Sequence, residues 1–231
     1  NFMGRSSTAS ASFMVFGNPN VPIVQVRGGT SFTTTPSSVL TIYSSSTKAS
    51  CAEKQVTFST RWQVYTTDMV LVSSAVTTSR DPSILVLSPL TLSPGARYRA
   101  VVTTTASASN TQPSVSATAE AQITVQNGQV IARVSGGDSR LVPATEVVRI
   151  DASSSYDENL GSAAPSVGLT FAWTCSYLTA SQFGASCNNV FVTGTTTQPS
   201  VSVQGLLLDS TQIYSFTVRA ASADGRSASK S

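Results

Sequence analysis

The sequence predicts an all-β protein made of two tandem β-sandwich repeats, and three observations lead to this prediction. Short segments that alternate apolar and polar residues recur between turns rich in Gly, Pro, Asn and Ser, as strands do. No stretch keeps a helical period. One strand occurs twice, once in each half of the chain, and its apolar residues share one face because strand side chains alternate. These residues are Val56, Phe58, Trp62 and Val64 in the first copy, and Leu169, Phe171, Trp173 and Cys175 in the second.

Each repeat opens with an apolar strand that ends in a Gly-Gly pair. The first Gly of this pair is Gly28 in the first repeat and Gly136 in the second. The next strand, marked by Tyr43 and Asp151, keeps the same offset between the two repeats. The offset is slightly larger between Trp62 and Trp173, and larger again between Tyr98 and Tyr214. Because the register holds within strands, we expect the extra residues to lie in loops.

Closing strands are predicted at 10–16 and 119–125, which share an alternating rhythm that stops at Asn and Gly. We therefore expect residues 1–20 to be the closing strand of a preceding repeat with its linker, 21–127 to be the first repeat, and 128–231 to be a second repeat lacking its last strand. A missing strand exposes an unpaired edge. Two explanations are open. The sequence is a window cut from a longer chain, which we favour, or residues 10–16 of another copy supply the strand.

A Tyr opens a late strand of each repeat, six residues after a Leu: Tyr98 follows Leu92, and Tyr214 follows Leu208. This spacing is typical of the tyrosine corner of immunoglobulin-like sandwiches, which also carry a Trp on the third strand. The predicted fold class is therefore all-β, with two tandem immunoglobulin-like β-sandwiches. Such aromatic residues could instead stack on sugar in a lectin-like groove. The alternation of side chains along the strands places them on the apolar face, which favours the core. The predicted core aromatics are Trp62, Trp173, Tyr98 and Tyr214.

The composition excludes several classes of function. Histidine, the commonest general base and metal ligand, is absent, and no nucleophile motif replaces it, so we expect no enzymatic activity, no catalytic residue and no cofactor. The 14 basic residues are scattered, so no nucleic-acid partner is expected. No apolar run approaches the ~20 residues that span a bilayer. Only 11% of residues are charged, and a surface polar through Ser and Thr suits close packing against neighbours or O-linked sugar.

One acidic cluster is a candidate Ca²⁺ site, because loop carboxylates suit a hard cation. The simpler interpretation is that Asp151 and Ser153 to Ser155 bond the backbone of their own turn. The sequence favours the turn, because no spacing resembles a dedicated calcium loop and Tyr43 stands in the first repeat where Asp151 stands in the second. The candidate ligands are Asp138, Asp151, Asp157 and Glu158.

The chain has three Cys. Cys175 and Cys187 flank a short loop rich in Ser and Gly, so a disulfide between them is predicted. Cys51 has no partner by position, because Val64 stands where the second repeat has Cys175. Some Ser and Thr residues near Pro have the composition of O-glycosylated segments, although a plain solvated loop explains them about as well. These candidate sites are Thr33, Thr34, Thr35, Ser37, Ser88 and Ser93.

The run Asp-Ala-Ser-Ser-Ser-Tyr-Asp at 151–157, followed by Leu-Thr-Phe-Ala-Trp-Thr-Cys at 169–175 and a second Cys, resembles a known family. It is similar to the polycystic-kidney-disease-type (PKD-type) and receptor-for-egg-jelly (REJ) repeats of polycystin-1-like ectodomains. The resemblance covers 129–220 well and 21–126 weakly. The chain lacks the Trp-Asp-Phe-Gly-Asp-Gly run of the PKD type and has Trp-Thr-Cys, as REJ modules do. In its low content of charged residues, the chain also resembles giant algal surface proteins related to polycystin-1, such as those of flagellar hairs (mastigonemes).

The resemblance implies a non-enzymatic extracellular structural or adhesion module. We expect it to be part of a long tandem array that forms a stalk, spacer or filament at the cell or flagellar surface. Its partners would be other repeats of the same long chain, and filament or cell-surface proteins. The alternative is a receptor ectodomain of a polycystin-1-like membrane protein that binds carbohydrate or protein.

Overall fold

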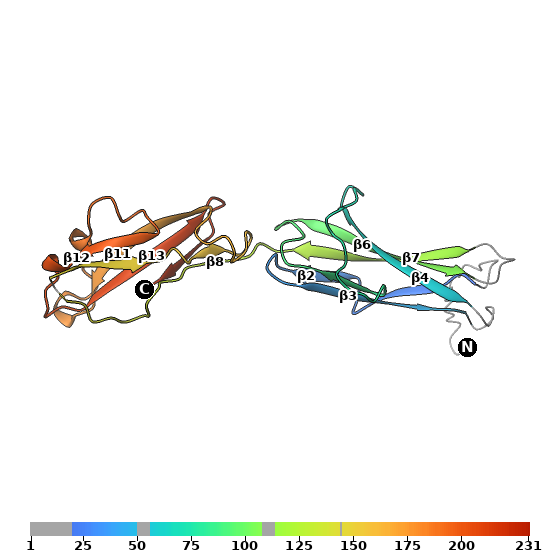
Figure 1. Ribbon diagram of the computed structural model, residues 1–231, viewed down its shortest axis with the longest axis horizontal. Helices are drawn as coiled ribbons and strands as arrows, with labels where there is room; N and C mark the ends of the chain where they lie inside the picture. Colours follow the sequence, from blue (N-terminus) through green and yellow to red (C-terminus); the bar gives the residue numbers. More distant parts are fainter. Residues whose placement is uncertain (1–19, 50–55, 108–113, 144) are drawn as a thin grey trace, which may run out of the picture. The chain divides into compact units, whose positions relative to one another are not determined.

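The computed structural model describes residues 20–49, 56–107, 114–143 and 145–231. The strands of these residues form two immunoglobulin-like β-sandwiches in tandem, coloured blue to green and yellow to red in Figure 1, so the predicted fold class is confirmed. The strand predicted at 10–16 and Cys51 lie outside the described residues. No helix in the described ranges has the length and apolar character needed to cross a membrane.

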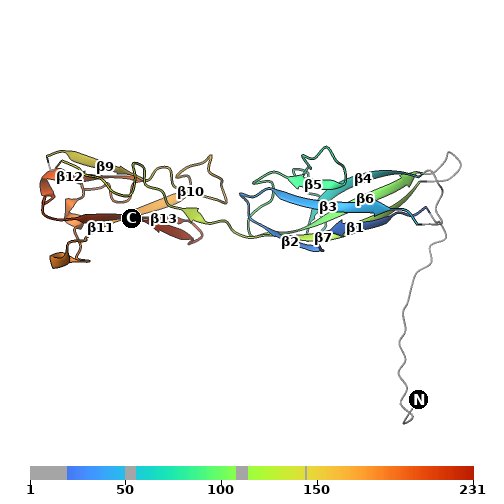
Figure 2. The same ribbon diagram turned by 90° about the horizontal axis from the view of Figure 1, so that it is seen from below.

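Two sheets make the first sandwich, one with strand order β1-β3-β5 and one with order β2-β7-β6-β4 (Figure 2). β1 runs antiparallel to β3, with Ile23 opposite Thr47 and Arg27 opposite Tyr43. Gly28 and Gly29 follow β1 with φ angles of 86° and 113°, a region that Gly adopts without steric cost. The strands are β1 (Ile23–Arg27), β2 (Ser31–Thr34), β3 (Leu40–Thr47), β4 (Thr57–Thr66), β5 (Ile84–Leu87), β6 (Arg97–Ser107) and β7 (Val115–Val125).

The first core follows the alternation of its strands. Along β6, every second side chain from Tyr98 to Ala106 is buried. Trp62 and Val64 of β4 are buried in the same alternating pattern, and Trp62 is only 8% exposed.

Phe58, which the sequence places on the core face of β4, is instead 38% exposed. In the register that aligns Trp62 with Trp173, Phe58 corresponds to Leu169 at the start of its strand, and Thr60 corresponds to Phe171. The Thr60 hydroxyl lies 3.1 Å from the Thr104 hydroxyl, which lies 2.7 Å from that of Ser46. Paired hydroxyls therefore take the interior position that an aromatic ring takes in the second repeat.

Three sheets make the second sandwich: β11-β13-β14, β9-β12 and β8-β10. β11 and β13 pair over nine residues, from Leu169 opposite Ser222 to Tyr177 opposite Tyr214. Three short 3-10 turns lie between its strands: η2 (Ala180–Gln182), η3 (Asn188–Val190) and η4 (Gly205–Leu207). The strands are β8 (Val130–Ile131), β9 (Val147–Asp151), β10 (Tyr156–Asp157), β11 (Leu169–Tyr177), β12 (Ser200–Gln204), β13 (Tyr214–Ser222) and β14 (Ser227–Lys230).

The second repeat contains a four-residue strand after β13, in a part of the repeat where the sequence predicted none. β14 pairs antiparallel with β13, with Val218 opposite Lys230 and Ala221 opposite Ser227. Its sequence, Ser-Ala-Ser-Lys, lacks large apolar residues, and Ala228 is its member that packs against the core. The alternation of large apolar side chains that reveals the other strands is therefore missing here. The repeat boundaries at 20 and 127 stay predictions.

The second core is a single cluster of buried side chains contributed by strands of all three sheets. Phe171, Trp173 and Cys175 enter it at alternating positions of β11. The Trp173 indole Nε1 donates a hydrogen bond to the Gln198 carbonyl oxygen at 3.0 Å, which satisfies the polar atom of a buried ring. The predicted disulfide between Cys175 and Cys187 is confirmed, and both residues belong to this core.

Candidate functional site

The four acidic residues considered as calcium ligands are each engaged by a different partner. Asp138 pairs with Lys230 at 2.7 Å between Oδ1 and Nζ. The Asp151 carboxylate accepts a hydrogen bond from the Ser153 backbone N–H at 2.9 Å, which is the Asx-turn bond expected from the sequence. No group of three or more His, Cys, Asp or Glu able to hold a metal ion occurs in the part of the chain that the structure describes.

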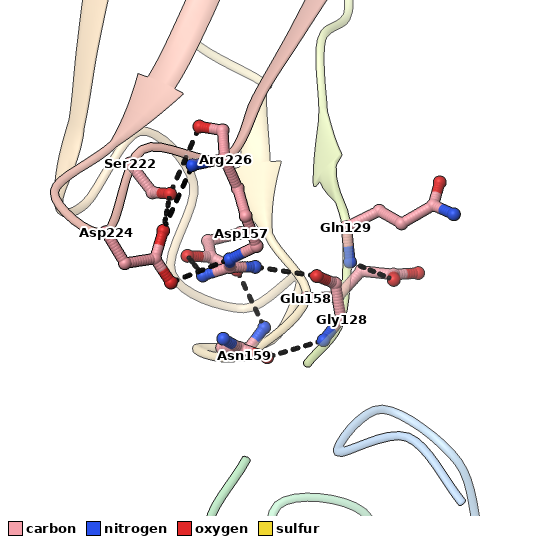
Figure 3. Close-up of polar contacts among 8 residues, drawn as sticks. All are labelled: Gly128, Gln129, Asp157, Glu158, Asn159, Ser222, Asp224 and Arg226. Carbon is pink, nitrogen blue, oxygen red and sulfur yellow. Dashed lines mark hydrogen bonds and ion pairs between the residues drawn. The ribbon is translucent and has the colours of Figure 1, made fainter. Parts of the chain in front are cut away.

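Asp157 instead binds an arginine. Both oxygens of its carboxylate accept hydrogen bonds from the Arg226 guanidinium, at 2.8 Å from Nη1 and 2.7 Å from Nη2 (Figure 3). The Asp157 side chain is 7% exposed and that of Arg226 is 22% exposed. A planar guanidinium matches a carboxylate in this two-bond geometry, and mutual pairing offsets the cost of burying the two charges. Bonding to Asp157 is the largest cause that raises the pKa of Arg226.

The same guanidinium also binds its own turn, the hairpin between β13 and β14. Its Nε donates to the Asp224 carboxylate at 2.7 Å, and the Ser222 hydroxyl donates to the other oxygen of Asp224. These two side-chain bonds, the Ser222 bond first, lower the pKa of Asp224 to about 2. Asp224 therefore remains ionised beside Arg226 over nearly the whole pH range in which proteins stay folded.

Arg226 also binds the backbone that leads into the second sandwich. Its Nη1 donates to the Gly128 carbonyl oxygen at 2.7 Å, and the Gly128 N–H donates to the Asn159 side-chain oxygen at 2.7 Å. The Glu158 carboxylate accepts from the Gln129 N–H at 2.8 Å. A Cβ added to Gly128 would lie 2.6 Å from the Cβ of Glu158. Only Gly allows this close approach of the two segments.

These contacts form one network, which we call the Arg226 clamp (Figure 3). The Arg226 guanidinium binds both the Asp157 carboxylate and the Gly128 carbonyl oxygen, so the chemistry here is that of a structural tie. Its members are Gly128, Gln129, Asp157, Glu158, Asn159, Ser222, Asp224 and Arg226.

No functional role for Arg226 or Asp224 was predicted from the sequence. A signal was present: Ser-Ala-Asp-Gly-Arg at 222–226 contains the Asp-Gly pair that is typical of a tight hairpin turn. That signal predicts the hairpin. It does not predict the partner of Arg226, because Asp157 is 69 residues away in sequence.

The predicted core aromatics lie at structural positions. Trp62, Trp173 and Tyr98 are buried, and Tyr214 is half-buried against the second core. The Tyr98 hydroxyl accepts a hydrogen bond from the Ser93 N–H at 3.0 Å, and that of Tyr214 accepts one from the Asp209 N–H at 2.7 Å. Both bonds run back five residues to the preceding turn, which is the tyrosine corner of immunoglobulin-like folds.

The candidate O-glycosylation sites differ in exposure. Thr33, Ser37, Ser88 and Ser93 are exposed, whereas Thr34 and Thr35 are half-buried. Thr34 donates its hydroxyl to the Thr35 carbonyl oxygen at 3.3 Å, and the Thr35 hydroxyl lies 2.9 Å from that of Ser38. The four exposed residues are therefore the more accessible positions for a sugar.

Comparison with known proteins gives one family match. The REJ domain family model matches residues 45–231, and a search of curated protein sequences returns no match. Similar solved structures include three N-terminal domains of the bacteriophage RB49 outer capsid protein Hoc (11% identity, TM-score 0.29, 90% of this chain and 65% of that chain). They also include Drosophila N-cadherin EC1-4 (13%, 0.32, 89% and 47%). The Clostridium thermocellum CbhA fibronectin(III)-like modules also match (11%, 0.24, 90% and 90%).

Proposed function

Because the chain belongs to the REJ domain family, we propose that it is a non-enzymatic module of an extracellular structure, one part of a long tandem array that forms a stalk, spacer or filament at the cell or flagellar surface. The Cys175–Cys187 disulfide supports an oxidising compartment outside the cytosol. The low content of charged residues, 11%, suits a surface that packs against neighbouring modules.

The observation that carries this proposal is the path of the chain through the first sandwich. The chain enters at Ile23, opposite Thr47, near the end of β6, because Ser46 bonds Thr104. It leaves at Val125, whose N–H donates to the Ala96 carbonyl oxygen just before β6 begins. Entrance and exit therefore lie at opposite ends of β6, an 11-residue strand about 36 Å long. Repeats threaded in this way add length to a chain, as a spacer requires.

The test is where the native protein is found. Antibodies raised against this chain should label extended surface structures by immunoelectron microscopy, and the protein should stay with them when membranes are dissolved in detergent. An unrelated membrane protein from the same cells is the control for complete extraction. Label confined to the membrane, full extraction by detergent and saturable binding of a soluble carbohydrate or protein would instead establish the receptor alternative.

Sugar on exposed Ser and Thr residues would support an extracellular surface role. We propose O-linked glycans at Thr33, Ser37, Ser88 and Ser93, which are exposed. Mass spectrometry of peptides from the native protein should find hexose additions at these residues, and their absence from all four would refute this part of the proposal.

A further inference from the structure

The first residues of the second sandwich, 128–135, form a segment that we call the strap. Its only regular pairing is between β8 and β10, with Tyr156 opposite Ile131 and Asp157 opposite Val130. Two residue pairs hold this strand, whereas nine join β11 to β13. The backbone ladder of the strap is therefore short compared with that at the centre of the sandwich.

Apolar packing of the strap is also limited. Val130 is its one side chain in the buried core, and Ala132 and Val134 pack partly against that core. Further anchors lie outside this ladder. The Arg133 N–H donates to the Ser155 hydroxyl at 3.0 Å, and the Ser135 N–H donates to the Asp151 carbonyl oxygen at 2.8 Å. The Gln129 carbonyl oxygen accepts from the Glu158 N–H at 3.0 Å, and the Arg133 guanidinium lies 5.0 Å from the centre of the Tyr156 ring. Loss of the strap would leave Phe171, Trp173 and the disulfide in place, because these belong to β11 and the loop that follows it.

The Arg226 clamp closes the N-terminal end of this strap. Arg226 ties Gly128 to Asp157 on the partner strand β10 and to Asp224 on the β13–β14 hairpin. Tension that reaches the second sandwich along the preceding chain arrives first at this end. The ion pairs of the clamp therefore stand between the pulled chain and the weak two-residue ladder behind them.

We propose that the Arg226 clamp is a latch that decides whether the strap stays in the sandwich or detaches as extra linker. Detachment of eight residues frees a segment whose contour length is about 26 Å, while the β11–β13 centre remains folded. The second sandwich then yields in two stages, a reversible first stage controlled by Arg226 and a later one that unfolds the core. In the proposed stalk, the released segment would act as additional linker. The opening of the strap itself does not depend on that proposed function and can be measured on the isolated chain.

Hydrogen exchange on the full 231-residue chain measures this opening, because amide exchange reports local detachment separately from global unfolding. The strap probes are the amides of Gln129, Arg133 and Ser135, and the centre probes include the Trp173 amide, which bonds the Thr196 carbonyl. Arg226→Gln should speed exchange of the strap amides by at least about tenfold and leave the centre within about twofold. Arg226→Lys, which keeps the charge but loses the two-bond geometry, should give a smaller increase.

The matched control is Arg219→Gln. Arg219 lies on the same hairpin and donates to the Ser227 hydroxyl at 3.0 Å from Nη2, so its loss should leave the strap unchanged.

Equal acceleration of strap and centre in Arg226→Gln and Arg226→Lys would overturn the latch, because the clamp would then serve only global stability. Unchanged exchange in both variants would overturn it as well. If Arg226→Gln does not fold, Asp224→Asn, which leaves the Asp157 pair intact, must still accelerate the strap selectively. A negative result here leaves the proposed stalk untouched, since the localisation experiment does not depend on Arg226.

Discussion

Removing the disulfide of the second sandwich should weaken that sandwich alone. Cys175 lies on β11 and Cys187 lies 12 residues later, and both are buried in the second core. The double variant Cys175→Val/Cys187→Ala is the suitable change, because Val64 occupies the position of Cys175 in the first repeat and a sandwich of this kind accepts Val there. The variant therefore removes the cross-link with little change in the volume of the core.

The size of the effect follows from the length of the closed loop. A cross-link between residues 12 positions apart removes about 9.5 cal/mol/K of entropy from the unfolded chain, or about 3 kcal/mol at 25 °C. A sandwich of roughly a hundred residues has a urea m-value of about 1 kcal/mol/M. The unfolding midpoint of the second sandwich should therefore fall by about 3 M urea.

Tryptophan fluorescence can follow the two sandwiches separately, because the chain has two Trp and each repeat buries one of them, Trp62 and Trp173. In a Trp62→Phe background, the signal of Trp173 reports the second sandwich. A Trp173→Phe background reports the first sandwich and is the internal control. Reduction of the disulfide by dithiothreitol in the Trp62→Phe protein should lower the urea midpoint of the second sandwich as much as the double variant does.

Two results would refute this reasoning. A midpoint for the second sandwich that moves by less than about 0.5 M urea would mean that the unfolded state gains no freedom when the cross-link is lost. An equal shift of the Trp62 signal would mean that the two sandwiches do not unfold independently.

Three further outcomes are expected. Trp173→Ala should destabilise the second sandwich by about 3–5 kcal/mol, since it empties a core aromatic, while the fluorescence transition of Trp62 stays in place; loss of ligand binding with full stability would contradict this. Tyr214→Phe and Tyr98→Phe should each cost about 1 kcal/mol in urea titrations, the net value of one hydrogen bond, and unchanged midpoints would show that the corner bonds are not stabilising. The pKa of Asp224 is lowered to about 2 from 3.8, so its contribution to stability is complete above about pH 4 and declines as pH falls toward 2. Asp224→Asn should remove this part of the acid dependence, and identical pH profiles for both proteins would exclude it.

The core positions show how far the sequence pattern reaches. Alternation placed Trp173, Phe171 and Cys175 on one buried face of β11, as found. It also placed Phe58 in the first core, but Phe58 is 38% exposed, and the next residue on that face, Thr60, bonds Thr104 in the interior. Alternation predicts which face of a strand a side chain occupies. It does not state how far the opposing sheet extends, and that extent decides whether a residue near a strand end is covered.

The sequence by itself determined the local features of this protein: strands with a period of two, two repeats in register, two tyrosine corners and a disulfide closed over 12 residues. The strands, the tyrosine corners and the disulfide depend on residues close together in the chain, so spacing is enough to predict them. The repeats are found by comparing one half of the sequence with the other. The tertiary structure alone decided the Arg226 clamp, which joins Arg226 to Gly128 across 98 residues and to Asp157 across 69. Such a tie depends on where the sheets bring distant turns together, and a guanidinium takes as its partner whichever carboxylate the fold places beside it.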